Sequence, residues 1–369
     1  MGALNVLALN SGSSSLKFGL YRVDSSGAER LFGESVDTAA QPDAITQVTH
    51  VTRVLANAGM PPPQAIGHRI VHGGPALRQH CRIDDAVLQQ LQAAAAFAPL
   101  HTPAALALIR FGQQHFPGLP QVACLDTQFH AGLPDVARVL PIAKELQAQG
   151  IQRYGFHGLS IESTVRQLGS AVPERLVVAH LGNGASVTAL KAGLSIDTSM
   201  GMTPSGGVIM GTRSGDIDPG VLVYLVREQQ FDAARLAALM DHGSGLLGIS
   251  GLSGDMRMLH AAAASNRDAR LAIEMFCYSV RKQVAAMSAV LGGLDMLVFT
   301  GGIGENDAQV RAEICTGLAW MGVNLDASRN RSIGPSGGLV SCGASLCPVL
   351  VLASQEDEQI ARHAWALLA

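Results

Sequence analysis

The chain has 369 residues, of which 48% are hydrophobic and 15% charged, with 41 glycines and a formal net charge of −3. This length exceeds the size at which one hydrophobic core keeps growing, so we expect two domains. The glycine-rich, weakly charged composition is typical of a compact α/β enzyme. A slightly acidic chain without clusters of Lys and Arg is disfavoured as a nucleic-acid-binding protein.

The amino terminus leads directly into a strand-like segment, without the basic and apolar regions of a secretory signal. The chain contains no uninterrupted run of about 18 apolar residues, which is the length that a membrane-spanning helix requires. We therefore expect a cytoplasmic protein with no nucleic-acid or membrane partner. The six cysteines lack the CxxC spacing of a zinc site, and we expect buried, reduced thiols at Cys81, Cys124, Cys277, Cys315, Cys342 and Cys347.

Two glycine-rich segments, about half a chain apart, interrupt apolar runs of β-forming residues. Residues 6–18 and 177–187 each predict a strand, a tight turn and a second strand. Glycines in these turns allow the backbone to approach a ligand, and the hydroxyl and N–H groups beside them suit phosphate. Two such turns in matching contexts predict a duplicated domain that holds a nucleotide phosphate tail between its copies.

Further elements follow the first hairpin in chain order. The segment 24–41 predicts a strand edge with loops, and the apolar spacing of the next segments predicts a helix over 44–58, a strand over 64–72, helices over 84–97 and 102–115, and a strand over 121–126. The proline at position 103 suits the first turn of the second of these two helices.

The pattern restarts at the second hairpin. It predicts helices over 221–228, 231–240 and 268–291 and a buried strand over 294–300. A glycine turn over 301–306 and a helix over 308–320 come next, and together they present backbone N–H groups to an anion or nucleotide. A strand over 348–352 and a terminal helix over 357–368 complete the series.

Several polar residues stand on otherwise apolar or glycine-rich segments. Phosphoryl transfer needs positive groups around the phosphate oxygens and a carboxylate that supports a metal, with little covalent chemistry from the protein. Candidates for the positive groups are Arg69, Arg213 and His157, and Asp126 and Glu356 can orient a hydrated Mg²⁺. Each has a structural alternative, since an arginine can pair with a carboxylate, a histidine can be a buried donor and an aspartate can cap a turn.

Four apolar residues would ordinarily be assigned to the core, but their joint placement beside these polar residues makes them candidates for a small apolar pocket: Val71, Leu100, Phe156 and Pro204. The chain contains neither GxxxxGK[ST] nor the glycine-rich loop and the HRD and DFG motifs of protein kinases. The phosphate site must therefore be built by other means.

With these segments in view, the chain closely resembles the acetate kinase (acetokinase) family, within the superfamily of acetate and sugar kinases, heat-shock ATPases and actin. The segment 9–17 and the segment 197–204, continuing to 211–213, are similar to family signatures. The segments 248–257 and 300–306 are similar to its nucleotide-binding elements and occur in the same order. The match spans nearly the whole chain.

The resemblance implies an α/β fold of two duplicated actin-like (ribonuclease H-like) domains with an active-site cleft between them, used as a homodimer. Its domains would be residues 1–129 completed by 357–369, and the nucleotide-binding domain 130–356. The activity implied is reversible, Mg²⁺-dependent transfer of the γ-phosphoryl group of ATP to acetate, giving acetyl phosphate and ADP by direct in-line transfer. Mn²⁺ is the alternative metal.

The resemblance also assigns roles to individual positions. It implies catalytic roles for Arg69, Asp126, His157 and Arg213, and metal ligands at Asn10 and Glu356. Arg69 would bind the substrate carboxylate, and Val71, Leu100, Phe156 and Pro204 would enclose its methyl group. The nucleotide-binding positions implied are Lys17, His180, Leu181, Gly182, Asn183, Gly184, Asp255, Met256, Arg257, Gly302, Ile303, Gly304 and Asn306.

Two segments depart from the family pattern. Ser205-Gly206-Gly207 replaces Leu-Glu-Gly after the proline, which leaves acetate and propionate open as preferred substrates. Residues 353–357 replace Pro-Thr-Asn-Glu-Glu but keep the glutamate at position 356. Other readings are a kinase for another short-chain acid, one that uses pyrophosphate, or a non-catalytic actin-like ATP-binding protein. The adenosine-side segments count against pyrophosphate, and the retained arginines and His157 favour catalysis.

Overall fold

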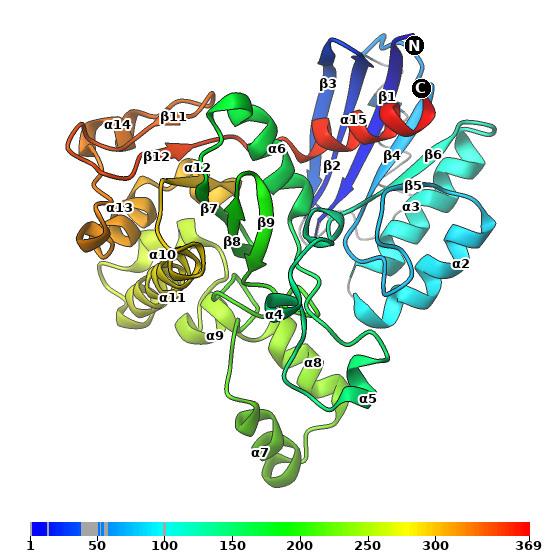
Figure 1. Ribbon diagram of the computed structural model, residues 1–369. Coiled ribbons are helices and arrows are strands. Elements are labelled where there is room, and N and C mark those ends of the chain that lie inside the picture. The colour runs from blue at the N-terminus through cyan, green and yellow to red at the C-terminus, as the bar shows by residue number, and fades with distance from the viewer. Residues whose placement is uncertain (1, 13–14, 38–50, 52, 55–57, 99–100) are drawn as a thin grey trace. The chain divides into compact units, whose positions relative to one another are not determined.

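The computed structural model describes residues 2–12, 15–37, 51, 53–54, 58–98 and 101–369. Over these residues the chain forms two compact units. The first comprises Met1–Ala131, His157–Ser163 and Gln355–Ala369, and the second comprises Gly132–Phe156 and Thr164–Ser354. Each unit is built around one mixed sheet, and the described residues give each sheet six strands (Figure 1).

The sheet of the first unit has the strand order β3-β2-β1-β4-β6-β5. Its strands are β1 (Leu4–Ser11), β2 (Ser15–Asp24), β3 (Gly27–Asp37), β4 (Ala65–Ile70), β5 (Cys81–Arg82) and β6 (Gln121–Leu125). The first three form an antiparallel meander, and β4 and β6 run parallel to β1. The short edge strand β5 is antiparallel to β6.

Alternate residues of β1 supply the cores on the two faces of this sheet. Leu7 and Leu9 pack on one face with Leu108 and Phe111 of α3 (Thr102–His115). Val6 and Ala8 pack on the other face with residues of α15 (Glu356–Leu368). This is the period of two expected for a strand that is covered on both sides. The remaining helical elements of this unit are α2 (Asp85–Ala93), η1 (Ala94–Phe97), η2 (Gln128–His130) and the start of α6 (Gly158–Leu168).

The sheet of the second unit has the order β11-β12-β10-β7-β8-β9. Its strands are β7 (Arg175–Leu181), β8 (Ala185–Lys191), β9 (Leu194–Thr198), β10 (Met296–Thr300), β11 (Gly338–Leu339) and β12 (Val349–Val351). Again three antiparallel strands are followed by two strands parallel to the first and a short antiparallel edge strand. The two sheets therefore share one topology, which confirms the predicted duplication.

Helices of the second unit cover this sheet and extend beyond it. The 25-residue α11 (Arg267–Leu291) packs against β7 and β8. The others are α4 (Asp135–Arg138), α5 (Lys144–Gln147), η3 (Gly169–Ala171), α7 (Pro219–Gln229), α8 (Ala233–His242), α9 (Gly245–Ser250), α10 (Met256–Ala262), α12 (Gly301–Asn306), α13 (Ala308–Thr316), η4 (Ala319–Met321) and α14 (Ala327–Ser332). Neither α7 nor α8 contains a buried residue.

Most of the predicted elements are confirmed, with four corrections. The predicted turn over 301–306 is helix α12, and the helix predicted over 308–320 ends at Thr316 before the 3₁₀ turn η4. The helix predicted over 84–97 changes to 3₁₀ geometry after Ala93. The sequence did not predict strands β5, β9 and β11 or helices α4, α5, α6, α9, α10 and α14. The helix expected over 44–58 lies largely outside the described residues.

All six cysteines are free thiols. Four of them are buried, as expected, but Cys81 and Cys342 are only half-buried. Burial raises the pKa of the Cys277 thiol well above its usual range, so this thiol stays protonated near neutral pH. No helix in the described part of the chain is long and apolar enough to span a membrane.

His68 of β4 makes the stability of the first unit depend on pH. Its ring is buried and its Nε2 donates to Oε1 of Gln121 at 2.6 Å. Burial lowers its pKa to about 4. The unfolded chain takes up this proton near pH 6.5 and the folded chain does not. The contribution of His68 to the free energy of unfolding is therefore fully present above pH 6.5. It is lost as the pH falls toward 4, by about 1.4 kcal/mol per pH unit at most.

We expect wild-type protein to lose about 2 kcal/mol more unfolding free energy between pH 7 and pH 5 than the His68→Gln variant. Urea unfolding of both proteins at the two pH values measures this difference. Equal losses in the two proteins would show that His68 is not the group responsible.

Candidate active site

Three predicted site residues of the first unit lie at the carboxyl ends of adjacent parallel strands. Asn10 is the next-to-last residue of β1, Arg69 the next-to-last of β4, and Asp126 directly follows β6. Because β4 pairs with both β1 and β6, the structure brings these three together. The carboxyl ends of parallel strands are where open α/β sheets bind ligands.

Arg69 and Asp126 form a buried ion pair. Nη2 and Nε of Arg69 lie 2.5 and 3.0 Å from Oδ2 of Asp126. The arginine side chain is 11% exposed and the aspartate side chain is fully buried. Oδ1 of Asp126 is also buried, and it has no hydrogen-bond partner within the described residues. The arginine thus holds one carboxylate oxygen, and the lone pairs of the other are not used by any described residue.

Burial and charge act in opposite directions on this pair. Burial alone lowers the pKa of Arg69, but the carboxylates of Asp126 and Glu356 outweigh it, so the pKa of the guanidinium rises and it stays charged. Burial raises the pKa of Asp126, and the charge of Arg69 opposes that rise. A buried charge is tolerated in a protein when it is paired in this way.

Asn10 connects this pair to the first turn of α15. Its Nδ2 donates to Oε2 of Glu356 at 2.9 Å and to Oδ1 of Asp357 at 2.8 Å. Its Oδ1 accepts from Nη1 of Arg69 at 3.3 Å. Acidic residues are favourable at a helix amino terminus, where the helix dipole is positive. Asp357 was not predicted as part of the site, and burial raises its pKa.

The oxygen atoms of this group fit a hard divalent cation. Carboxylate and amide oxygens are the ligands that Mg²⁺ takes in proteins. Asp126 Oδ1 is buried without a partner, and Asn10 is linked by hydrogen bonds to two further carboxylates. The predicted metal residues Asn10 and Glu356 therefore belong to one group with Asp126.

His157 adopts a left-handed backbone conformation next to the Asp126 turn. Its φ is 58°, and Gly155 before it has φ 75°. A non-glycine residue with positive φ is uncommon and persists when its surroundings hold it. The N–H of Gly158 donates to the carbonyl of Asp126 at 2.9 Å, and a Cβ at Gly158 would meet that oxygen at 2.2 Å. Only glycine permits this approach.

A second group of predicted residues lies in the second unit, on the β7–β8 hairpin. His180 is near the end of β7 and pairs in register with Thr300 at the end of β10. The turn that follows is closed by a hydrogen bond from Gly182 N–H to the carbonyl of Gly184. The carbonyl of Asn183 accepts from the N–H of Gly211, which fixes the turn from outside.

Helix α12 follows β10 directly and contains Gly302, Ile303, Gly304 and Asn306. Gly301 has φ 78°, and a Cβ there would meet the carbonyl of Leu181 at 2.8 Å, so the helix starts tightly against β7. Oε1 of Glu305 accepts from the N–H groups of Gly301 and Ser354. Glu305 was not predicted, and it determines how this short helix begins.

Asp255, Met256 and Arg257 form the start of α10. Asp255 is the amino-terminal cap and accepts from the N–H of Arg257, and its carboxylate also pairs with the Arg257 side chain at 2.6 Å. Further along α10, Nε2 of His260 lies 2.8 Å from Oδ2 of Asp307, directly after α12. This contact connects α10 with the end of α12, the two segments that were predicted to bind the adenosine part of the nucleotide.

Arg213 is buried in the second unit, and its Nη1 donates to the carbonyl of Pro204 at 3.1 Å. The structure therefore brings a predicted catalytic residue and a predicted pocket residue together. Phe156 of this unit and Val71 of the first unit are both buried. Leu100 lies outside the described residues.

Lys17 belongs to the first group by position. It is exposed on β2, directly across from Asn10 of β1. The segment Ser205-Gly206-Gly207 is ordered by side-chain contacts: Ser205 Oγ donates to Asp241, and Gly207 N–H donates to Oδ1 of Asp216 at 2.7 Å.

Comparison with known proteins decides the family. The model of the acetokinase family matches residues 33–362. The chain belongs to the acetokinase family. It is 40% identical to an acetate kinase of Nitrobacter hamburgensis, over 99% of this chain and 96% of that one. It is 45% identical to an acetate kinase of Thermosynechococcus vestitus, over 82% of this chain and 74% of that one.

Two solved structures have the same fold as this chain. An acetate kinase of Porphyromonas gingivalis superimposes with a TM-score of 0.84 at 33% identity, and the match covers 99% of this chain and 100% of that one. A propionate kinase of Francisella tularensis superimposes with a TM-score of 0.87 at 35% identity and the same coverage. The expected actin-like fold of an acetokinase is therefore confirmed.

Proposed function

We propose that this protein is an acetate kinase, which transfers the γ-phosphoryl group of ATP reversibly to acetate and forms acetyl phosphate and ADP. The observation that carries the proposal is the partly buried Arg69, paired with Asp126 and hydrogen-bonded to Asn10, in a chain 40% identical to an acetate kinase over 99% of its length. Asn10 lies in the signature-like segment 9–17, and the resemblance implies catalytic roles for Arg69 and Asp126.

The chemistry needs cations and alignment more than proton transfer. A carboxylate substrate is already ionised at pH 7, so no general base is required to activate it. Charge develops on the phosphoryl oxygens in the transition state, and preorganised cations stabilise it. Arg69 remains charged because of its carboxylate neighbours. We assign this role to Arg69, Arg213 and His157, and transfer is direct and in line.

Asn10 and Glu356, with Asp126, would hold Mg²⁺. When bound, the metal would neutralise charge on the nucleotide phosphates. Until then the contacts of Asn10 with Glu356 and Arg69 keep these groups in place. We assign the hairpin residues from His180 to Gly184, the start of α10 and helix α12 to the nucleotide.

The substrate pocket decides between acetate and propionate. Val71, Phe156, Pro204 and Leu100 are assigned to the methyl group. One extra methylene is worth about 1–3 kcal/mol of discrimination in such a pocket. We therefore expect acyl phosphate from acetate and ATP, a lower kcat/KM with propionate and a lower one still with butyrate. A hydroxamate assay with the three acids measures this, and EDTA should abolish the product. If none of the three acids gives a product, the activity is contradicted and the alternative of a non-catalytic ATP-binding protein is favoured.

Replacing Arg213 with alanine should lower kcat by about 10²–10³, because a donor that stabilises transition-state charge is lost. Arg213→Lys keeps the charge but not the planar fork, and should recover only part of the rate. Arg267→Ala, at the exposed start of α11, is the matched control and should keep full activity. A near-normal kcat in folded Arg213→Ala would remove this residue from the mechanism.

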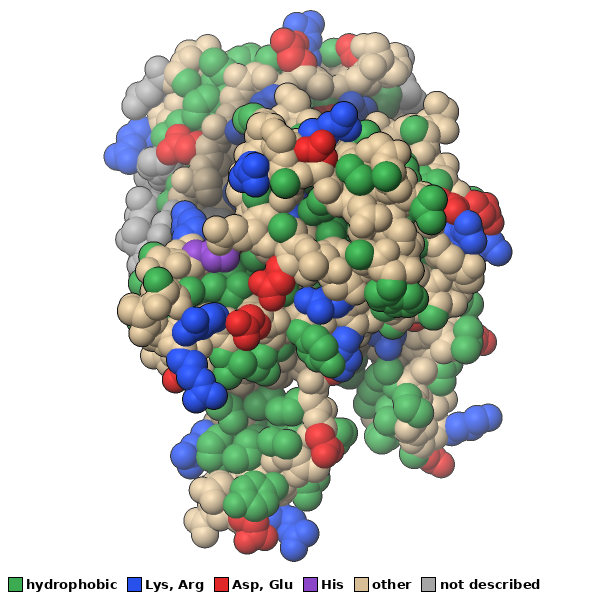
Figure 2. Space-filling view, turned by 90° about the vertical axis from the view of Figure 1, so that its left-hand side faces the viewer, with side chains coloured by type: hydrophobic (Ala, Val, Ile, Leu, Met, Phe, Trp, Pro, Cys, Tyr) green, Lys and Arg blue, Asp and Glu red, His purple; other side chains and the backbone are tan. Residues whose placement is uncertain are grey.

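We also propose a homodimer that uses α7. This helix has no buried residue, and Val223, Tyr224 and Val226 are about half-exposed. Hydrophobic side chains gather at the lower end of the molecule in Figure 2, the end at which α7 lies in Figure 1. Apolar surface of this kind is typical of a protein–protein interface.

Sedimentation velocity tests the dimer. We expect wild-type protein to sediment as a dimer and the Tyr224→Glu variant to shift toward monomer, because the new charge would be buried in the interface. A Glu228→Gln variant on the same helix serves as the control. A monomeric wild type at micromolar concentration would contradict the proposal.

A further inference from the structure

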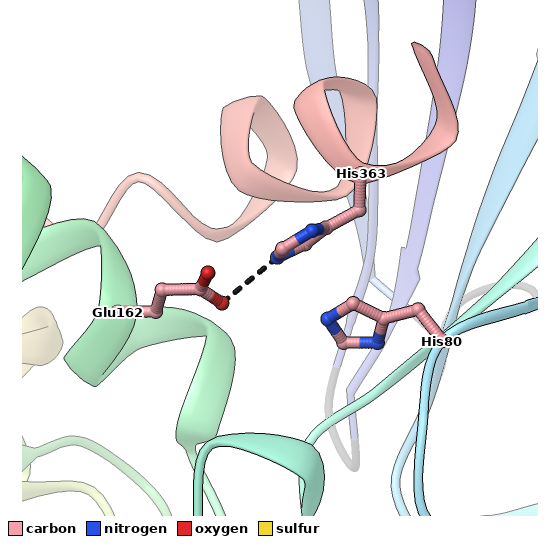
Figure 3. Close-up of side chains that lie close together, drawn as sticks. All are labelled: His80, Glu162 and His363. Carbon is pink, nitrogen blue, oxygen red and sulfur yellow. Dashed lines mark hydrogen bonds and ion pairs between the residues drawn. The ribbon is translucent and has the colours of Figure 1, made fainter. Parts of the chain in front are cut away.

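Three titratable side chains of the first unit meet away from the residues assigned above. They come from three elements: His80 directly before β5, Glu162 of α6 and His363 of α15 (Figure 3). Nε2 of His363 lies 2.8 Å from Oε2 of Glu162, and the rings of His80 and His363 are 3.9 Å apart between centroids. One possible ligand atom of each residue lies within 4.8 Å of the others.

The hydrogen bond at the far side of His80 determines what this ring can do. Its Nδ1 accepts from the backbone N–H of Leu125 at 2.9 Å. In the neutral ring the proton must then be on Nε2, and a metal ligand needs a free lone pair there. Burial, with the charge of His363, lowers the pKa of His80 to about 3, so the ring is neutral at physiological pH. The cluster is therefore not arranged as a metal site.

Instead, His80 contacts both ends of the turn that carries Asp126. Its ring accepts from Leu125, the residue before Asp126. Its backbone N–H donates to Oε1 of Gln128, two residues after Asp126. These contacts lie on either side of the aspartate whose carboxylate pairs with Arg69. A small displacement of that turn would move the carboxylate.

The other two members of the cluster restrict where the ring of His80 can lie. Nε2 of His80 is buried and points toward the Glu162 and His363 side chains, and no described residue accepts a hydrogen bond from it (Figure 3). The hydrogen bond between His363 and Glu162 joins α6 to α15 on that side. Because α6 begins at Gly158, whose N–H donates to the carbonyl of Asp126, the same helix contacts the turn directly.

We propose that His80 is a positioning residue for Asp126, acting through the acceptor at Nδ1 and through its backbone N–H, and that Glu162 and His363 keep its ring in place. This inference rests on the proposed function, because it assigns a purpose to the position of Asp126. A positioning role differs from a purely structural one because kcat of the folded enzyme then depends on one ring atom, Nδ1 of His80. An asparagine at position 80 supplies an oxygen near the position of Nδ1, whereas a glutamine supplies polar atoms near Nε2.

The test compares His80→Asn with His80→Gln, and His115→Gln is the control for an exposed histidine of the same unit. We expect His80→Gln to lower kcat by about 10- to 100-fold, the effect of a small misplacement of a reacting group. His80→Asn should retain most of the rate, and the KM for ATP should change little in either. Equal rates in both variants, or an unchanged kcat in folded His80→Gln, would overturn the proposal.

A second pair of variants leaves the ring intact. Gln128→Leu removes the acceptor for the His80 N–H and should lower kcat, whereas Gln128→Glu keeps an acceptor and should recover it. This pair tests the proposal even if the His80 variants do not fold. If both Gln128 variants keep the wild-type rate, the backbone contact of His80 does not position the turn, and that part of the proposal is overturned.

Two further measurements separate the possible failures. Arg69→Ala, assayed in parallel, should lose activity; if it does not, the proposed function fails, and if it does while His80→Gln remains active, only the present inference fails. Titration with ZnCl₂ by calorimetry should show no binding that His80→Gln abolishes. Zinc binding that requires His80 would place a lone pair on Nε2 and overturn the proposal.

Discussion

The buried ion pair of Arg69 and Asp126 is the interaction on which the first unit's site depends. Asp126 is fully buried and Arg69 is 11% exposed, so each largely satisfies the charge of the other, and loss of Arg69 would leave an unpaired buried carboxylate. Asn10 contacts the arginine and Gly158 contacts the aspartate backbone. The ends of three strands, the start of α6 and the start of α15 are therefore constrained by a single pair of opposite charges.

Much of this architecture could be predicted from the chain because its signals are local. The hairpins 6–18 and 177–187 consist of apolar runs around glycine turns, and antiparallel neighbours need no distant partner to form. The start of helix α3 was predicted correctly because Pro103 marks its first turn. The order of the parallel strands depends on contacts between distant segments, and only the resemblance to a family indicated it.

Elements that depend on distant partners were predicted poorly. Helix α12 reads as a turn because glycine is a weak helix former, and its first turn is completed by Glu305, which also accepts from Ser354. Asp357 reads as an ordinary helix residue until Asn10, far away in sequence, is seen to contact it. His80 carries no local signal at all, since its partners Leu125 and Gln128 follow it by more than forty residues.

The position of α15 in the chain has a consequence for biosynthesis. This helix covers the sheet of the first unit and carries Glu356, yet the whole second unit lies between it and the strands that it covers. Asn10 and Glu356 are 346 residues apart. A nascent chain can form the meander β1-β2-β3 early, but one face of its sheet stays without α15 until the whole second unit has been synthesised. That apolar face is where a chaperone would be needed during synthesis.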